Sequence, residues 1–217
     1  MNVVTVSNSD TIGGAALGAY HLHKSLQSLG VESQMVVQTK TCDDPSIIGP
    51  PTKLRETINS LRPTLDAFPT IFYKNKRSFF SPAWLPFSNI VDTINQIDAD
   101  IVHLHWIAAG TMSIEDISRI KKPVVWSLHD MWPFTGGCHY DGGCGKYRSY
   151  CAACPALGSN RRNDLSHCVF SRKVKSYAKI PSLTLVGLSR WIEDCARNST
   201  VFSGRRVVNI SRIGQMS

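Results

Sequence analysis

A histidine–aspartate pair is the first feature of this sequence that favours chemistry. His129 and Asp130 follow directly on residues 124–128, an apolar VVWSL run that predicts a short buried strand. In an open α/β sheet the ligand crevice lies beyond the carboxyl ends of the strands, so the pair is expected at the working site. A histidine there can polarise a developing charge or hold a substrate hydroxyl. The alternative is a histidine packed beneath the loop that follows.

The loop after this strand carries four cysteines, spaced C-x5-C-x6-C-x2-C at Cys138, Cys144, Cys151 and Cys154. A CxxC end with two further thiols suits a tetrahedral thiolate site, because short turns can bring four sulfurs to about 2.3 Å from one ion. A structural zinc ion that folds the loop is therefore predicted, with His139 and His167 as reserve ligands. Free thiols and a redox CxxC are the alternatives.

A glycine pair near the N-terminus predicts a close approach of the backbone to a ligand. Gly13 and Gly14 separate a β-rich run at residues 2–6 from a helical segment at residues 15–29. Glycines there direct backbone N–H groups at an anion such as a phosphate bound to the helix start. The pattern is not GxGxxG, and the alternative is a tight strand-to-helix turn whose small residues serve packing.

Two histidines on one face of a further strand are a weaker signal. His103 and His105 lie in IVHLHW, residues 101–106, which predicts a buried strand. Positions i and i+2 share a face and could share a metal, but the signal is weak without a nearby carboxylate. Histidines in the core or lining the crevice are the expectation.

Strand and helix segments alternate about five times, which predicts an α/β fold with a single doubly wound, mostly parallel Rossmann-like sheet. Further strands are expected at residues 31–38 and 183–188, and a polar connection at residues 39–51. Helices are expected at residues 53–61, 88–97, 114–120, 163–178 and 190–198, the first of them cut by Pro63.

Residues 68–87 fit no regular element. They mix aromatic residues and prolines with the cations Lys74, Lys76 and Arg77, which predicts an ordered loop. Such a loop contacts an acceptor or a membrane surface, or its aromatic side chains pack over a sheet end.

The composition fits one globular domain with an uneven charge. A chain of 217 residues with 42% hydrophobic content can bury one substantial core. The net charge is +8. Residues 121–217 carry 15 basic and 5 acidic side chains, or +10, whereas residues 1–120 carry 9 and 11, or −2. The basic half favours an anionic partner such as a phosphate, a phospholipid surface or a nucleic acid, or else it is a solvated face.

The first residues have no basic start and too few apolar side chains for a signal peptide or for a spanning helix of about 20 residues. The protein is therefore predicted to be cytoplasmic. In a reducing compartment its seven cysteines are thiols or metal ligands rather than disulfides. Three of them are expected to be plain buried residues: Cys42, Cys168 and Cys195.

Several stretches together resemble one known family. They are GGAA at residues 13–16, DIVHLHW at residues 100–106, SLHDMWPFTGGCHYDGGCGKYRSYCAACP at residues 127–155 and LSRW at residues 188–191. Over residues 1 to about 206 the chain resembles the N-terminal, acceptor-binding domain of family-four glycosyltransferases. These are enzymes with two Rossmann-like domains (the GT-B fold), of the bacterial surface-polysaccharide type.

The resemblance implies retaining transfer of a hexosyl unit from a nucleotide sugar to a glycan or lipid-linked acceptor. By this resemblance Gly13 and Gly14 approach the donor phosphates, His129 lies beside the transferred sugar, and stabilisation of the departing phosphate assists the reaction. The basic half suits an anionic lipid-linked acceptor, with peripheral association at the inner face of the membrane. Such an enzyme has no nucleic acid partner.

The end of the sequence departs from that family. Residues 1–206 correspond to the N-terminal domain, residues 207–217 form an aberrant or truncated tail, and the donor-binding C-terminal domain is absent. The chain is therefore expected to be inactive alone. The alternative is a non-catalytic, zinc-stapled basic module that binds nucleic acid or a protein partner. Against it, the loop aromatics cluster around WPF instead of alternating with Arg and Lys.

Overall fold

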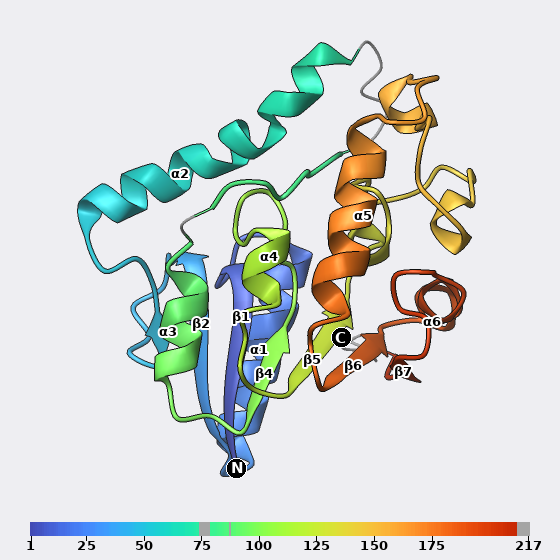
Figure 1. The fold of residues 1–217 in the computed structure, drawn as a ribbon. Helices are drawn as coiled ribbons and strands as arrows, with labels where there is room; N and C mark the ends of the chain where they lie inside the picture. The colour runs from blue at the N-terminus through green and yellow to red at the C-terminus, as the bar shows by residue number, and fades with distance from the viewer. Residues whose placement is uncertain (74–78, 87, 212–217) are drawn as a thin grey trace.

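The computed structural model describes residues 1–73, 79–86 and 88–211, so the cations Lys74, Lys76 and Arg77 lie outside it (Figure 1). Its centre is a seven-stranded sheet in the order β3-β2-β1-β4-β5-β6-β7, and all neighbouring strands are parallel. This confirms the predicted α/β fold with a Rossmann-like sheet. The strands are β1 (Asn2–Ser9), β2 (Glu32–Thr39), β3 (Ile47–Ile48), β4 (Ile101–Leu104), β5 (Val124–Leu128), β6 (Leu183–Gly187) and β7 (Arg206–Asn209).

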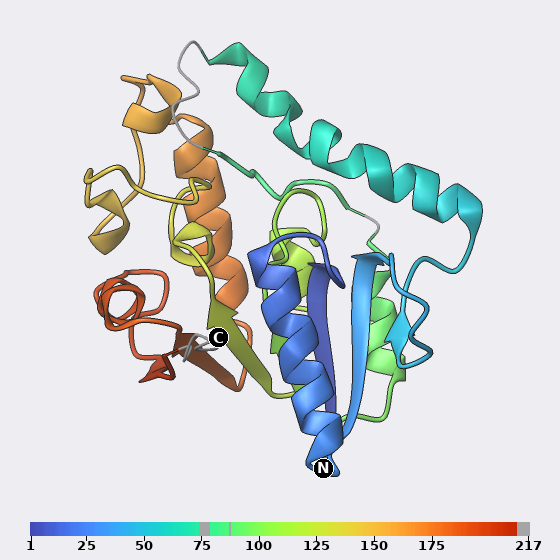
Figure 2. The same ribbon diagram turned by 180° about the vertical axis from the view of Figure 1, so that it is seen from behind.

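Helices cover both faces of the sheet. α1 (Gly14–Ser28) lies on one face, and α3 (Ile90–Gln96), α4 (Ile114–Ile117) and α5 (Leu165–Tyr177) lie on the other (Figure 1, Figure 2). α6 (Arg190–Arg197) leads into β7. The side chains of Ser113 and Ser189 cap α4 and α6, because each accepts a hydrogen bond from the N–H three residues on. Within the described residues no helix has both the length and the apolarity that a bilayer crossing requires.

α2 (Lys53–Ala67) is longer than the sequence predicts. The expectation that Pro63 ends this helix is wrong. Proline has no N–H, so the carbonyl four residues earlier, that of Asn59, loses its helical partner. Gln38 Nε2 donates to that carbonyl at 3.0 Å, and the Asn59 amide donates back to the Gln38 carbonyl at 3.0 Å. β2 thus replaces the lost bond, and the chain continues into the short 3-10 helix η1 (Phe68–Phe72).

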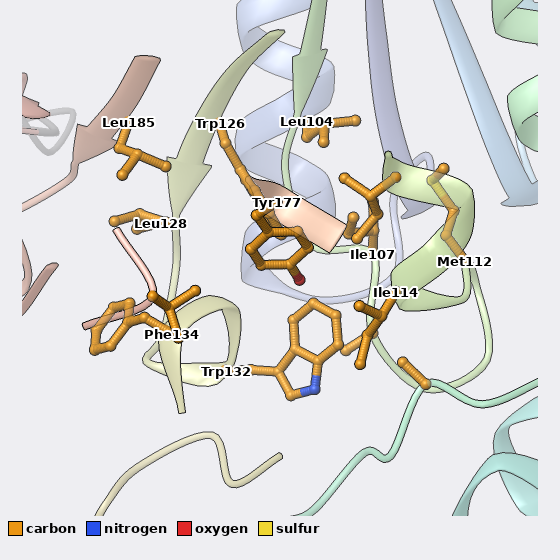
Figure 3. Close-up of a cluster of buried hydrophobic side chains, with 14 of the residues drawn as sticks. Leu104, Ile107, Met112, Ile114, Trp126, Leu128, Trp132, Phe134, Tyr177 and Leu185 are labelled. Carbon is orange, nitrogen blue, oxygen red and sulfur yellow. The ribbon is translucent and has the colours of Figure 1, made fainter. Parts of the chain in front are cut away.

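The main core lies between the sheet and the helices α4 and α5. Trp126 of β5 packs edge-on against Tyr177 of α5, with ring centroids 5.5 Å apart. Trp132 and Phe134, from the loop after β5, join this cluster and are at most 2% exposed (Figure 3). Burial of side chains of this size contributes about 2 to 3 kcal/mol each. The start of the loop is therefore fixed by the core.

Two strands lie in segments that the sequence predicts as irregular. β3 pairs with β2 inside the proline-bearing connection at residues 39–51. β7 pairs with β6 and carries the sheet to Asn209, beyond the domain end expected at residue 206. Both strands lie at sheet edges and are short, as edge strands commonly are.

Candidate active site

The candidate site lies at the carboxyl end of the sheet, where the strand order reverses between β1 and β4. A crevice of 710 Å³ opens there, lined by Ala15, Phe79, Trp106, His129, Asp130, His139, Tyr140 and Gly142. A larger hollow of 940 Å³ lies at the opposite end, around strand starts such as Asn2 and Glu32. Ligands of doubly wound sheets bind beyond the carboxyl ends of the strands, so we assign the function to the smaller crevice.

His129 lies half-buried on the wall of this crevice rather than sealed beneath the loop. Its Nε2 is 3.0 Å from Nδ1 of His105, and Nε2 of His103 is 2.9 Å from the hydroxyl of Ser127. Burial above all, together with the charge of His129, lowers the pKa of His103 to about 4. His105 therefore contacts the ring of His129 from behind the crevice wall, and His103 packs against His105.

Asp130 holds the loop after β5 together. Its Oδ2 accepts hydrogen bonds from Trp106 Nε1 at 2.9 Å and from His139 Nδ1 at 2.6 Å, and its Oδ1 accepts one from the Trp132 N–H at 2.8 Å. Burial opposes ionisation, but these hydrogen bonds, that of His139 above all, place the pKa of Asp130 below its ordinary value. An ionised carboxylate with three donors already bound suits positioning better than proton transfer.

His139 is a crevice residue whose place the sequence does not predict. Its Nδ1 is paired with the Asp130 carboxylate. Its other ring nitrogen, Nε2, is buried and has no hydrogen-bond partner in the described part of the chain. The ring packs against Phe79 and Trp106, with centroid distances of 4.4 and 5.5 Å. A buried polar atom without a partner is rare in proteins, and a ligand hydroxyl could satisfy it.

The glycine pair opens the α1 end of the crevice. Gly13 has a φ of 93°, which favours glycine, and no heavy atom lies within 4 Å of a Cβ built at Gly13 or Gly14. The adjacent Ala15 lines the crevice. In the same loop Asp10 accepts hydrogen bonds from residues 41–42. Burial opposes ionisation of Asp10, but these hydrogen bonds place its pKa below the ordinary value. The same bonds connect the glycine loop to the loop after β2.

The four loop cysteines line one small cavity: Cys138, Cys144, Cys151 and Cys154. In the described residues, however, no group of three or more His, Cys, Asp or Glu side chains is arranged to hold a metal ion, and these cysteines are free thiols. The structure therefore does not support the zinc prediction. Burial raises the pKa of Cys138 and of Cys151 to about 12, which keeps both protonated. The loop is braced instead by Lys146, whose Nζ donates to the carbonyls of Ala152 and Ala153 at 2.7 and 2.6 Å.

The residues grouped with these cysteines in the sequence lie elsewhere. Cys195 is buried and Cys42 half-buried, but Cys168 is exposed, so the prediction of a buried residue is wrong there. His167 pairs with the hydroxyl of Tyr150, with its Nε2 at 2.9 Å.

Lys173 of α5 is a buried cation, and nothing in the sequence of the predicted helix at residues 163–178 distinguishes it from surface lysines. Its Nζ donates to the carbonyls of Trp132 and Thr135 and lies 4.0 Å from the centre of the Trp132 ring. The side chain is fully buried, and this burial lowers its pKa to about 7. Lys173 thus fixes the turn that follows Asp130.

A doubly wound parallel sheet with its crevice at the point of strand-order reversal defines a Rossmann-like ligand-binding domain. Within that class, the family described as Glycosyltransferase Family 4 matches residues 12–161, and the chain belongs to this family. The chain is also 25% identical, over 226 residues, to the putative colanic acid biosynthesis glycosyl transferase WcaC of Escherichia coli (strain K12). That match covers 96% of the chain and 54% of the relative, so the chain spans about half the length of the curated relative it matches.

Proposed function

We propose that this chain is the acceptor-side domain of a retaining hexosyltransferase and does not turn over a nucleotide sugar by itself. The observation that carries the proposal is the open crevice at the strand-order reversal, with His129 on its wall, inside the span that matches the family. Donor binding is assigned to a second domain, and the acceptor-side domain is proposed to extend through β7, to residue 209. No comparison favours the alternative of a nucleic-acid-binding module.

Each crevice residue has a role in this proposal. His129 holds a hydroxyl of the transferred sugar, and Asp130 positions the wall around it. Gly13 and Gly14 form the open start of α1, where backbone N–H groups and the helix dipole favour the donor phosphates and the negative charge that develops on them. Phe79, with Trp106 behind it, offers the apolar surface that orients a sugar ring in a mostly apolar pocket.

The proposed acceptor is a glycan or a lipid-linked glycan. The basic half of the chain, residues 121–217 with +10, supports an anionic acceptor, because such a surface attracts phosphate-bearing lipids at the inner face of a membrane. The relative's printed role in colanic acid biosynthesis is consistent with a polysaccharide as product.

Two measurements on the purified chain test this function. Calorimetric titration with oligosaccharide repeat units released from a bacterial surface polysaccharide is expected to show saturable binding. His139→Ala removes the buried Nε2 that lacks a partner in the described residues, so it is expected to weaken this binding by about two- to tenfold, the value of one hydrogen bond. The matched control His21→Ala, an exposed histidine of α1 away from the crevice, should bind like the wild type. Absence of binding, or equal binding by both variants, contradicts the assignment of the crevice.

The second measurement addresses activity. The chain is incubated with labelled UDP-sugars and GDP-sugars and a membrane lipid extract, and no sustained transfer is expected. Sustained transfer contradicts the statement that the chain is inactive alone, but it leaves the acceptor crevice in place. The assignment of the acceptor crevice and the statement that the chain is inactive alone can therefore be refuted independently.

A further inference from the structure

Two pairs of near-parallel aromatic rings border the carboxyl end of the sheet. Phe79 stacks on Trp106, and Tyr140 stacks on Trp191; in each pair the ring centroids are 6.2 Å apart and the ring planes are 23° from parallel. The first pair lines the crevice. The second pair, Tyr140 and Trp191, which we call the aromatic platform, adjoins the crevice, because Tyr140 also lines it.

The aromatic platform extends the crevice along the strand ends, away from the glycine pair. The strands run in the order β1-β4-β5-β6. The glycine pair follows β1, Trp106 follows β4, and Trp191 belongs to α6, which follows β6. In the loop after β5, His139 packs against Trp106, and the next residue, Tyr140, packs against Trp191. These two consecutive residues therefore join two neighbouring surfaces, one on the β4 side and one on the β6 side.

The rings of the aromatic platform stay exposed although they stack on each other. Tyr140 is 55% exposed and Trp191 is 53% exposed. Their contact is not needed to hold the loop after β5 beside α6 (Figure 1, Figure 2), because Thr200, after α6, already does so. Its N–H donates to the Tyr147 carbonyl at 3.1 Å, and its hydroxyl donates to the Arg148 carbonyl at 2.9 Å. Aromatic side chains beside a crevice are typical of a ligand-binding wall.

We propose that the aromatic platform binds a second sugar residue of the acceptor, so that the site takes a glycan of at least two sugars. This inference rests on the proposed function, because it extends the acceptor site. The face of an aromatic ring carries partial negative charge, and the C–H groups on one face of a pyranose ring carry partial positive charge, so the two faces attract each other. The hydroxyls at the edge of the sugar ring stay in water.

His139 marks the place of the first sugar. Its buried Nε2 has no hydrogen-bond partner among residues 1–73, 79–86 and 88–211, and a sugar hydroxyl supplies one. The Cα atoms of His139 and Tyr140 are about 3.8 Å apart, as in any two consecutive residues. A glycan whose first sugar lies at His139 therefore has its next sugar within reach of Tyr140 and Trp191.

A glycan fits the aromatic platform better than a second copy of the chain does. Two half-exposed rings offer on the order of 200 Å² of surface. A stable interface between proteins buries about 800 Å² on each partner. The glycan also runs toward β6, so it leaves the glycine pair after β1 open for the donor phosphates.

Calorimetric titration of the purified chain with monosaccharide and disaccharide fragments of one bacterial surface polysaccharide tests the inference. The disaccharide is expected to bind about two- to tenfold more tightly than the monosaccharide, the value of one aromatic contact. Trp191→Ala should remove this gain and leave monosaccharide binding unchanged, whereas Trp191→Phe, which keeps a ring, should retain most of it. His139→Ala is expected to weaken the binding of both fragments.

Phe72→Ala is the matched control. It removes an exposed ring of η1 that does not line the crevice, so this variant should bind both fragments like the wild type. Circular dichroism checks that each variant is folded. If Trp191→Ala does not fold, Tyr140→Ala replaces it with the same expectation.

Four results would overturn the inference. No binding of either fragment by the wild type refutes the proposed function and the aromatic platform with it. Equal affinity for the two fragments, unchanged in Trp191→Ala, refutes the platform alone. Equal weakening of both fragments by Trp191→Ala also refutes it, because Trp191 would then shape the crevice rather than bind a second sugar. A dimer in light scattering that Trp191→Ala abolishes, with disaccharide binding unchanged, would assign the rings to a second copy.

Discussion

Replacement of Lys173 by methionine is expected to change how the stability of this protein depends on pH. Burial holds the pKa of Lys173 at about 7 in the folded protein, against an ordinary value of 10.5. Between these two values the unfolded chain binds more protons than the folded one, so the free energy of unfolding rises with pH. From pH 7 to pH 9 the two pKa values give a rise of about 2 kcal/mol from this one group. Methionine has a similar shape and does not titrate, so this rise is absent from the variant.

The comparison is made by urea unfolding of wild type and Lys173→Met at a series of pH values from 6.5 to 9. At pH 9 the variant is expected to be less stable by about 1 to 3 kcal/mol, because the carbonyls of Trp132 and Thr135 lose their donor. At pH 7 this deficit should be about 2 kcal/mol smaller. A stability deficit of Lys173→Met that does not change with pH would refute the reasoning. The control is Lys175→Met, at an exposed position of the same helix, whose difference in stability from the wild type should not depend on pH.

Three further predictions concern the loop after β5 and the cysteines. Asp130→Asn leaves the donors around the carboxylate without a charged acceptor, so the free energy of unfolding at pH 7 should fall by about 2 to 4 kcal/mol in urea titrations. Because the folded pKa of Asp130 is lowered, the wild type should lose this advantage as the pH falls below about 4, and a difference that does not shrink between pH 5 and pH 2 would contradict the assignment. In thiol titration with Ellman's reagent, the exposed Cys168 should react in the native protein, and Cys138 and Cys151 only after unfolding. EDTA should leave the Tm unchanged, and a fall of the Tm would restore the zinc prediction.

The sheet was predictable because its signal is local. Residues 124–128 are covered on both faces, so the strand is a continuous apolar run, and its bounds match β5. The helix through Pro63 was not predictable, because the bond that rescues it comes from Gln38, 21 residues from Asn59. A two-residue strand such as β3 has no periodicity to detect.

The position of His129 at the crevice could be predicted because ligands bind beyond the carboxyl ends of parallel strands, and the strand before His129 is recognisable from its own sequence. The pairing of Asp130 with His139 depends on how the glycine-rich loop folds back, and the loop sequence carries no pattern for it. Lys173 reaches the Trp132 carbonyl from 41 residues away. In α2 the apolar spacing indicates a core-facing side by the ordinary rule, and the structure reverses it because the polar side chains find backbone partners inside.

Helix α2 and the crevice are physically connected. Arg62 of α2 donates to the Gly110 carbonyl, in the segment that also carries the crevice residue Trp106. Trp106 in turn donates to Asp130, whose carboxylate holds His139. α2 therefore fixes the segment after β4, and Trp106 carries that constraint to the loop after β5 on which His139 lies.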